Sequence, residues 1–170
     1  MEMNFCRRCG SRLTDKTNGV YVCENGHTLF ANSAPTVGMF FVTDDNQILL
    51  SVRGIEPLKG MLDTPGGFVD SAETFEEALA RELQEELGLD DSQYETPKYL
   101  CSASSEYLYQ NENRNVLTVF FWSKLHPGAQ PVADDDVADI KFAPVNDINI
   151  DEIGGRDIKT ALAKIREILL

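Results

Sequence analysis

Three glutamates near the middle of the chain have the side-chain type and the spacing that suit a divalent metal ion. Glu82, Glu85 and Glu86 occupy positions i, i+3 and i+4, so their carboxylates share one face if the segment is helical. Mg²⁺ and Mn²⁺ prefer hard oxygen ligands of this kind. The cluster therefore predicts a magnesium or manganese site, and such ions support reactions at phosphate by neutralising its oxygens and activating water.

The segment that carries these glutamates is predicted to form one helix, Phe75–Leu87. Thr74 and Glu77 fit a capping box at its start, and Gly88 is well suited to end it. A solvated acidic face is the usual explanation of a charge run. That explanation fits the acids of the first turn, which the helix dipole favours.

The angular positions of Glu82 and Glu86 around the helix do not fit a solvated face. At about 100° per residue, both fall inside the apolar stripe that should face the core, and Glu85 falls at its margin. An unpaired buried charge is very costly. The sequence therefore favours a functional reason for these carboxylates.

The remaining elements are those of an α/β fold with a mixed sheet. The loop signals between Gly54 and Gly67 predict an irregular, exposed segment there. Strands are expected at Val37–Thr43 and Gln47–Arg53, which read as a hairpin, and at Lys98–Ser104, Val116–Lys124 and Ala138–Phe142, with a last helix at Asp157–Leu170.

The loop before the acidic helix completes a longer pattern. It reads Gly67-x5-Glu73-x7-Arg81-Glu82-Leu83-x-Glu85-Glu86-x-Gly88-Leu89. This pattern resembles the complete box of the Nudix hydrolases. The resemblance implies an α/β/α sandwich with a mixed sheet, and hydrolysis of a nucleoside diphosphate linked to another group with the help of Mg²⁺ or Mn²⁺.

The same resemblance implies roles for single residues. Glu82, Glu85 and Glu86 correspond to the metal-binding acids of the family. Gly67 corresponds to a residue whose backbone carbonyl often joins them, and Arg81 and Glu73 correspond to a pair that orients the helix and loop. All of these positions match the family pattern.

The general base is left open between two candidates. Family members use either a glutamate of the box or an acid from a later loop. Asp136 lies six residues before Phe142, where many relatives have a loop glutamate six residues before a tryptophan. A solvated aspartate in a turn explains Asp136 equally well, given the neighbouring Asp134 and Asp135.

Three further residues are candidates for contact with the substrate. Arg53, at the end of a predicted strand, suits phosphate oxygens through its planar guanidinium. Tyr107 and Tyr109 alternate in sequence and could stack on a base. A surface arginine and half-buried packing tyrosines are the competing explanations.

A second group of residues has the spacing of a zinc site. Cys6-x2-Cys9 is followed, after thirteen residues, by Cys23-x3-His27, which supplies four ligands compatible with tetrahedral zinc. A redox pair and an exported disulfide fit less well, because a third cysteine and a histidine are present. Gly10 resembles the turn of a zinc knuckle.

The cysteine-rich segment is predicted to be a separate module. Residues 1–34 form a zinc ribbon in this interpretation, and residues 35–170 form the Nudix hydrolase domain. Several Nudix hydrolases, NADH pyrophosphatases among them, carry such a ribbon, usually with four cysteines, so His27 is a departure. Ser104–Tyr109 also departs from the Ser-Gln-Pro-Trp-Pro-Phe-Pro motif of NADH pyrophosphatases, and NADH is not assigned.

Composition narrows the classes of partner. The chain has 170 residues and a net charge of −13, which disfavours generic binding to nucleic acid. Residues 1–34 carry four basic and three acidic side chains, and residues 35–170 carry 11 and 25. No apolar run approaches the roughly 20 residues of a membrane span, and no signal-peptide pattern begins the chain. We expect a cytoplasmic protein; whether it forms a homodimer is left open.

The sequence thus predicts a metal-dependent pyrophosphohydrolase with a structural zinc ribbon. Its partner is expected to be a small nucleoside diphosphate derivative, with ADP-ribose or a nucleoside diphosphate sugar suggested by family prevalence and by the tyrosines. The alternative is a nucleotide-sensing or protein-docking module that uses a Nudix fold without turnover. Loss of box acids would favour that alternative, and none is lost.

Overall fold

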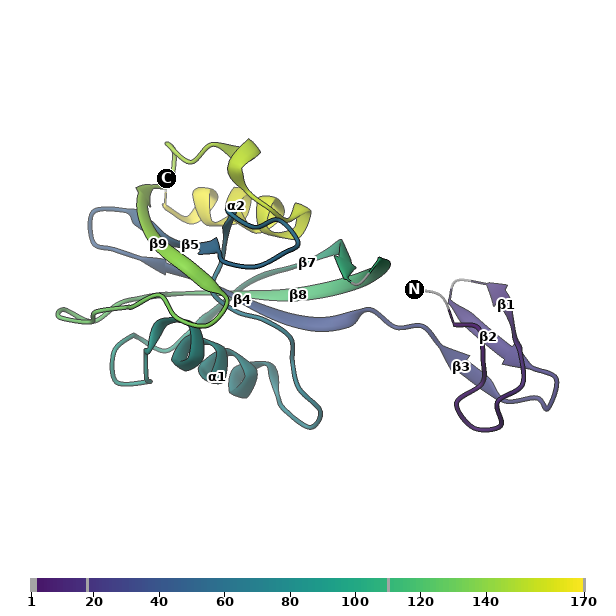
Figure 1. Cartoon of the computed structure of the whole chain (residues 1–170). Coiled ribbons are helices and arrows are strands. Elements are labelled where there is room, and N and C mark those ends of the chain that lie inside the picture. The colour runs from purple at the N-terminus through teal and green to yellow at the C-terminus, as the bar shows by residue number, and fades with distance from the viewer. Residues whose placement is uncertain (1–2, 18, 110, 170) are drawn as a thin grey trace.

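The computed structural model describes residues 3–17, 19–109 and 111–169 of the chain, and Figure 1 shows a small N-terminal sheet beside a larger sheet with two α-helices. The helices are α1 (Phe75–Leu87) and α2 (Arg156–Leu169), preceded by the short 3₁₀ helix η1 (Ile150–Glu152). The strands are β1 Leu13–Thr17, β2 Val20–Cys23, β3 Thr28–Phe30, β4 Ala34–Val42, β5 Gln47–Arg53, β6 Leu62–Asp63, β7 Lys98–Tyr109, β8 Glu112–Lys124 and β9 Val137–Pro144.

The larger sheet is mixed, as the sequence predicts. Its strand order is β6-β5-β4-β8-β7, and β9 also pairs with β5. The central strands β4 and β8 run parallel from Ala34↔Val116 to Val42↔Lys124, whereas β5 is antiparallel to β4 and to β9. The predicted hairpin between the first two strands is confirmed by the pair Val42↔Ile48.

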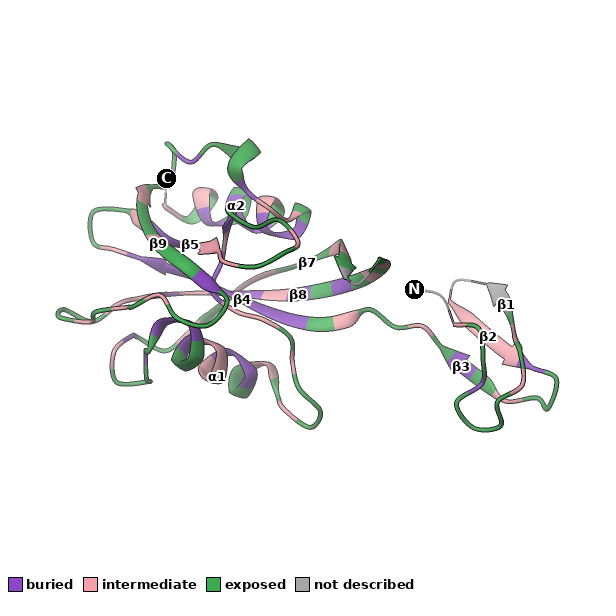
Figure 2. Cartoon of the chain, in the orientation of Figure 1, coloured by how far each residue is buried: buried purple, intermediate pink, exposed green. Residues whose placement is uncertain are grey.

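Alternation along β4 and β5 gives the sheet two apolar faces. Phe40 and Ile48 join a core that contains α2, whereas Phe41 and Leu49 join a core that contains α1. Figure 1 shows the two helices on opposite sides of the sheet, and Figure 2 shows most of β4 and β5 buried between them. Because strand side chains alternate between faces, this burial confirms the predicted α/β/α sandwich.

Most predicted elements are confirmed, with longer strands where hydrogen bonding continues past the apolar residues. The helix Phe75–Leu87 has the predicted bounds, and α2 begins one residue earlier than expected; Leu170 lies outside the described residues. The prediction of an irregular, exposed loop over residues 54–67 is wrong at its C-terminal end. Leu62 and Asp63 pair with β5 as β6, and Thr64 and Pro65 are buried.

The N-terminal sheet has the order β1-β2-β3 and a very small core of its own. Cys6, Cys23 and Leu29 are buried there, with Met3 and Leu13 packed against them. Figure 1 shows this sheet apart from the larger one, joined to it by the chain between β3 and β4. The division of the chain at residue 34 stays a prediction.

Among the described residues, no helix is long and apolar enough to cross a membrane.

Candidate active site

Helix α1 is fixed at both ends by its own sequence. The Thr74 side chain accepts a hydrogen bond from the Glu77 backbone N–H, and the Glu77 carboxylate accepts one from the Thr74 backbone N–H, so the predicted capping box is present. At the other end Gly88 adopts φ +64°, and its N–H bonds back into the last turn. These caps fix where α1 begins and ends, and therefore which of its glutamates face the sheet.

Glu86 is the buried carboxylate of the site, with 7% of its surface exposed. Its Oε2 accepts a hydrogen bond from the Gly66 backbone N–H at 2.8 Å. Burial, together with the nearby charges of Glu82, Asp63 and Asp136, raises the pKa of Glu86 to about 8, and the bond to Gly66 offsets only part of this effect. An ionisable carboxyl group placed here against that cost points to a functional group.

Arg81 organises the other acids of the box. Its guanidinium makes a two-pronged contact with Glu73, through Nε–Oε1 at 2.8 Å and Nη2–Oε2 at 3.0 Å. It also reaches Glu82 at 2.8 Å, Glu85 at 3.0 Å and the Phe68 carbonyl at 2.9 Å. The bond to Arg81 lowers the pKa of Glu73 to about 2. Arg81 therefore ties the loop before α1 to the middle of the helix.

Two glycines before α1 have no room for a side chain, Gly66 because of the β4 backbone and Gly67 because of Glu82 on α1. A Cβ on Gly67 would lie 2.5 Å from Glu82 Oε1, and a Cβ on Gly66 would collide with the Val37 carbonyl. Gly66 also has φ +136°, which is available mainly to glycine. The Gly67 carbonyl accepts a bond from the Val37 N–H at 2.9 Å, which leaves its second lone pair.

The three glutamates are neighbours, but their oxygens are not drawn into one compact cluster. Glu82 and Glu85 are held by Arg81, and the Glu85 side chain is 49% exposed. Glu86 turns instead to Gly66, and none of its other contacts occupies Oε1. The donor set of hard oxygens fits magnesium or manganese, and the assignment of Glu82, Glu85, Glu86 and Gly67 to that ion stays a prediction.

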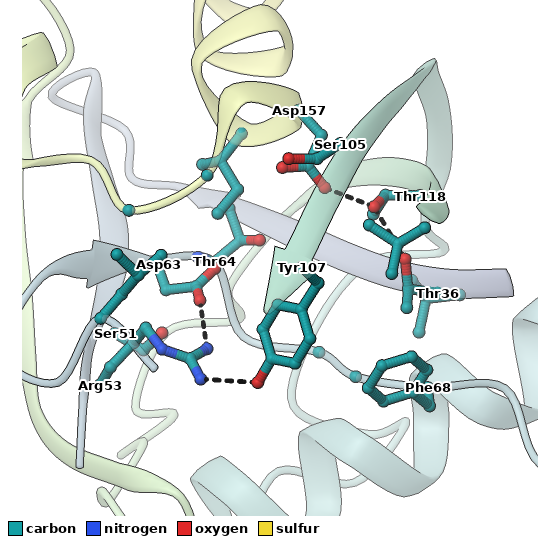
Figure 3. Close-up of a pocket in the computed structure, with 18 of the residues that line it drawn as sticks. Thr36, Ser51, Arg53, Asp63, Thr64, Phe68, Ser105, Tyr107, Thr118 and Asp157 are labelled. Atoms are coloured by element: carbon teal, nitrogen blue, oxygen red, sulfur yellow. Dashed lines mark hydrogen bonds and ion pairs between the residues drawn. The ribbon is translucent and has the colours of Figure 1, made fainter. Parts of the chain in front are cut away.

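A cavity of about 180 Å³ brings several predicted residues together. Arg53, Gly67, Glu86, Tyr107 and Asp136 all line it. Figure 3 shows Tyr107 near its middle, with Arg53 on one side and Phe68 on the other. Glu73, Arg81, Glu82 and Glu85 are not among its lining residues.

Arg53 is already paired at the cavity wall. Its Nη1 lies 2.8 Å from Asp63 Oδ2, and its Nη2 donates to the Tyr107 hydroxyl at 3.2 Å. Phe68 packs edge-on against Tyr107, with ring centroids 6.0 Å apart. These contacts hold Arg53 and Tyr107 in place; their roles in substrate binding remain predictions. The side chain of Tyr109 lies outside the described part of the chain.

The loop that carries Asp136 is anchored on the end of α1. The Val132 N–H donates to the Leu87 carbonyl at 3.0 Å, and the Asp134 N–H donates to the Glu86 carbonyl at 2.9 Å. These bonds satisfy carbonyls that the helix itself leaves free. They bring Asp136 to the cavity, where partial burial and Asp135 raise its pKa. Asp136 is exposed, so the turn explanation and the general-base explanation both stand.

Sequence reasoning missed a group of polar residues in the cavity wall. Asp63 comes from β6, within the segment expected to be irregular, and it is the ion-pair partner of Arg53. Thr36, Thr118 and Asp157 form a hydrogen-bonded chain on the other side of the cavity. No local pattern marks these residues, because strand pairing and the start of α2 assemble them from distant parts of the sequence.

The four predicted zinc ligands come together in the N-terminal module. The ligand atoms of Cys6, Cys9, Cys23 and His27 all lie within 4.8 Å of one another, the one such group of three or more metal-ligating side chains in the described residues. Gly10 has φ +74°, and its N–H bonds to the Cys6 carbonyl at 2.8 Å, which forms the tight turn after the first cysteine pair. This donor set fits tetrahedral zinc.

Comparison with known proteins agrees with this geometry. The family model described as "NUDIX domain" matches residues 32–162. A solved Nudix hydrolase from Nitrosomonas europaea superposes with a TM-score of 0.68 and 22% identity, over 97% of this chain and 91% of that one. This last similarity concerns the fold alone.

Two curated proteins are similar over shorter stretches. An ADP-ribose pyrophosphatase of Methanocaldococcus jannaschii is 52% identical over 48 residues, which are 28% of this chain and 28% of that protein. The NAD-capped RNA hydrolase NudC of Vibrio atlanticus is 36% identical over 92 residues, 53% of this chain and 34% of that protein. The matches thus span about a third or less of these relatives' own lengths.

The buried carboxylate predicts a pH dependence of stability. Because the pKa of Glu86 is raised in the folded state from 4.5 to about 8, its contribution to stability is present below pH 4.5 and is lost as pH rises through 8. In buffer without divalent metal, we expect Glu86→Gln to match the wild type near pH 5 and to exceed its free energy of unfolding at pH 8.5. Urea titrations at the two pH values measure this.

The control for that comparison is Glu76→Gln, which changes an exposed glutamate in the first turn of the same helix. Its stability relative to wild type should not rise between pH 5 and pH 8.5. A Glu86→Gln variant that is equally destabilised at both pH values would contradict the burial of a charge at this position.

The cysteine cluster predicts one tightly held zinc ion per chain, because residues 1–34 have too small a core to fold without a metal. Elemental analysis should find zinc in protein that was never exposed to added zinc. Cys23→Ser should lose the zinc and make the first 34 residues sensitive to protease, and Cys101→Ser, outside the module, is the control. Zinc-free protein with a protease-resistant N-terminus would refute the ribbon.

Proposed function

We propose, from the premise that this chain belongs to the Nudix family, that it is a metal-dependent pyrophosphohydrolase that cleaves a nucleoside diphosphate linked to another group. One observation carries the proposal. The carboxylate of Glu86 is buried in the wall of a cavity that also contains Arg53 and Tyr107. A metal-binding acid and candidate substrate contacts therefore face the same space.

The metal ligands in this proposal are Glu82, Glu85 and Glu86, joined by the carbonyl of Gly67. Mg²⁺ or Mn²⁺ bound by these groups would neutralise the oxygens of the diphosphate and lower the pKa of the attacking water. Arg81, tied to Glu73, forms ion pairs with Glu82 and Glu85 and holds them close to the end of the loop. This arrangement lets a strongly acidic protein accept a polyanion, because the phosphates meet the metal charge first.

ADP-ribose or a nucleoside diphosphate sugar is the substrate class that we favour. The Methanocaldococcus relative is named an ADP-ribose pyrophosphatase, and the cavity has an aromatic wall in Tyr107 and Phe68. The Vibrio relative is named an NAD-capped RNA hydrolase, so a dinucleotide belongs in the same test. The excess of acidic residues over residues 35–170 disfavours a long nucleic-acid substrate.

Proton transfer has two candidates among the carboxylates at the cavity. Burial raises the pKa of Glu86 to about 8, and in this proposal Glu86 is already engaged as a metal ligand. Asp136 lines the cavity on a loop anchored to α1, where it could take a proton from water without giving up a ligand position. Residues 1–34 serve in this proposal as a structural zinc ribbon.

The test of the proposed function is a magnesium-dependent phosphate-release screen, coupled to a phosphatase, over ADP-ribose, NADH, dinucleoside polyphosphates and nucleoside triphosphates. We expect turnover of ADP-ribose or another nucleoside diphosphate derivative, and loss of turnover when EDTA is added. A folded, metal-loaded protein that turns over none of these compounds would favour a nucleotide-sensing module instead.

Glu86→Gln should lower kcat by at least about a hundredfold, as expected when a charge that supports the transition state is removed. The change is nearly isosteric, and circular dichroism checks that the variant is folded. Glu76→Gln on the exposed side of α1 should keep wild-type turnover. Turnover close to wild type in folded Glu86→Gln would contradict the metal-site assignment.

Asp136→Asn separates the general base from a turn residue. If Asp136 takes the proton, kcat should fall by about 10²–10⁴-fold, while calorimetric titration finds nearly unchanged affinity for metal. The neighbouring Asp134→Asn is the control, since its backbone rather than its side chain anchors the loop to α1. An unchanged rate makes Asp136 a turn residue, and equal losses of rate and metal affinity make it a ligand.

A further inference from the structure

The cavity passes from the α1 side of the sheet to the α2 side. Gly66, Gly67 and Glu86 line it on the α1 side, whereas Gly155 and Asp157 line it where α2 begins. Figure 3 shows Asp157 beneath α2, across the cavity from Arg53. The two ends therefore offer different chemistry to the two ends of a ligand.

A hydrogen-bonded chain with one fixed direction lies at the α2 end. The Thr118 hydroxyl donates to Asp157 Oδ2 at 2.6 Å, and its oxygen lies 2.7 Å from the Thr36 hydroxyl oxygen. Each hydroxyl has only one proton. Because the proton of Thr118 points to Asp157, Thr36 donates to Thr118, and all three side chains have only acceptor capacity left for a ligand.

Asp157 has an unused oxygen that opens to the cavity. Its residue is 8% exposed, and none of the described hydrogen bonds reaches Oδ1. No fully buried side-chain oxygen of the described residues lacks a partner, so Oδ1 must be accessible from the cavity that Asp157 lines. Gly155 keeps this opening, because a Cβ there would lie 2.5 Å from Oδ1.

A buried carboxylate oxygen without a donor is costly, and a ligand that brings a donor removes the cost. The same negative charge repels phosphate, so the diphosphate belongs at the other end, where Arg53 and, under the proposed function, the divalent ion supply positive charge. The part of the ligand beside Asp157 must therefore be an uncharged group with an N–H or O–H donor.

The walls at this end favour a base over a sugar. Val116, Phe120 and Ile158 are apolar and line the cavity, and Tyr107 adds an aromatic ring. Ser105 also lines the cavity, and its rotatable hydroxyl can serve either a donor or an acceptor.

We infer that Asp157, held by Thr118 and kept open by Gly155, is a specificity-determining residue that accepts a hydrogen bond from the exocyclic amino group of the substrate's nucleobase. Adenine carries such a group at C6 and cytosine at C4, where hypoxanthine and uracil respectively have a carbonyl; guanine carries its amino group at C2 instead. This inference rests on the proposed function for the identity of the ligand as a nucleotide. It selects amino-bearing nucleoside diphosphate derivatives within that class.

The test is a calorimetric comparison of adenosine 5′-monophosphate and inosine 5′-monophosphate, which differ by an amino group against a carbonyl. We expect wild type to bind the adenosine compound about 10–100-fold more tightly, the usual size of a hydrogen bond to a charged group. In Asp157→Asn the side-chain amide can donate to the carbonyl, so this ratio should fall to near one or invert. Gly155→Ala, which crowds Oδ1, should also reduce it.

Asp151→Asn is the matched control, since Asp151 is exposed in η1, and thermal unfolding checks that each variant is folded. A wild-type ratio near one, a ratio unchanged in Asp157→Asn, or failure to bind either nucleotide would overturn the inference. Ribose 5-phosphate tests whether a sugar hydroxyl, rather than the amino group of the base, donates to Asp157. If Asp157→Asn weakens it as much as it weakens the adenosine compound, the carboxylate faces a sugar hydroxyl and the inference is wrong.

Because binding needs no turnover, the two claims can fail separately. If the protein hydrolyses nucleoside diphosphate derivatives but Asp157→Asn does not change the preference between nucleotides, the proposed function is supported and the inference about Asp157 is wrong. If the protein hydrolyses none of them but its preference between nucleotides depends on Asp157, the inferred specificity residue is supported and the proposed reaction is contradicted.

Discussion

Burial of a carboxylate between α1 and the glycine loop is the constraint on which the rest of the site depends. The Gly66 N–H faces the Glu86 carboxylate, and Gly67 lies so close to Glu82 that a side chain at position 67 would collide with it. The caps of α1 set its rotation, and the apolar residues of the same helix hold it against the sheet. A small rotation of α1 would move the carboxylate either into the core or into solvent.

The glutamates around this carboxylate differ in how far a positive charge neutralises them. Arg81 compensates Glu73, Glu82 and Glu85, whereas Glu86 has only a backbone N–H. A divalent cation is the natural counter-charge for such a set. At the other end of the same cavity, the described side chains of Thr36, Thr118 and Asp157 have only acceptor capacity left. The nucleotide inferred above would place its base there and its phosphates beside Glu86.

The sequence was most informative where chemistry and secondary structure share one segment. The helix Phe75–Leu87, its caps and the buried phase of Glu86 follow from residue spacing, since a single period of 3.6 fixes all of them. The wall residues Asp63 and Asp157 could not be predicted, because β6 pairing and the packing of α2 place them. The β6 strand was missed since its two residues follow a loop rich in glycine and proline, and only its pairing with β5 makes it a strand.

The central claim is that the buried carboxylate of α1 binds the divalent ion. Manganese is a direct probe, because free Mn²⁺ gives an electron paramagnetic resonance signal that disappears on binding. Titration of the zinc-loaded protein with Mn²⁺ should find one saturable site on the wild type and on Glu76→Gln, and an affinity at least about tenfold weaker in Glu86→Gln, as for loss of a group that supports metal binding. Equal Mn²⁺ affinity in wild type and folded Glu86→Gln would contradict the account.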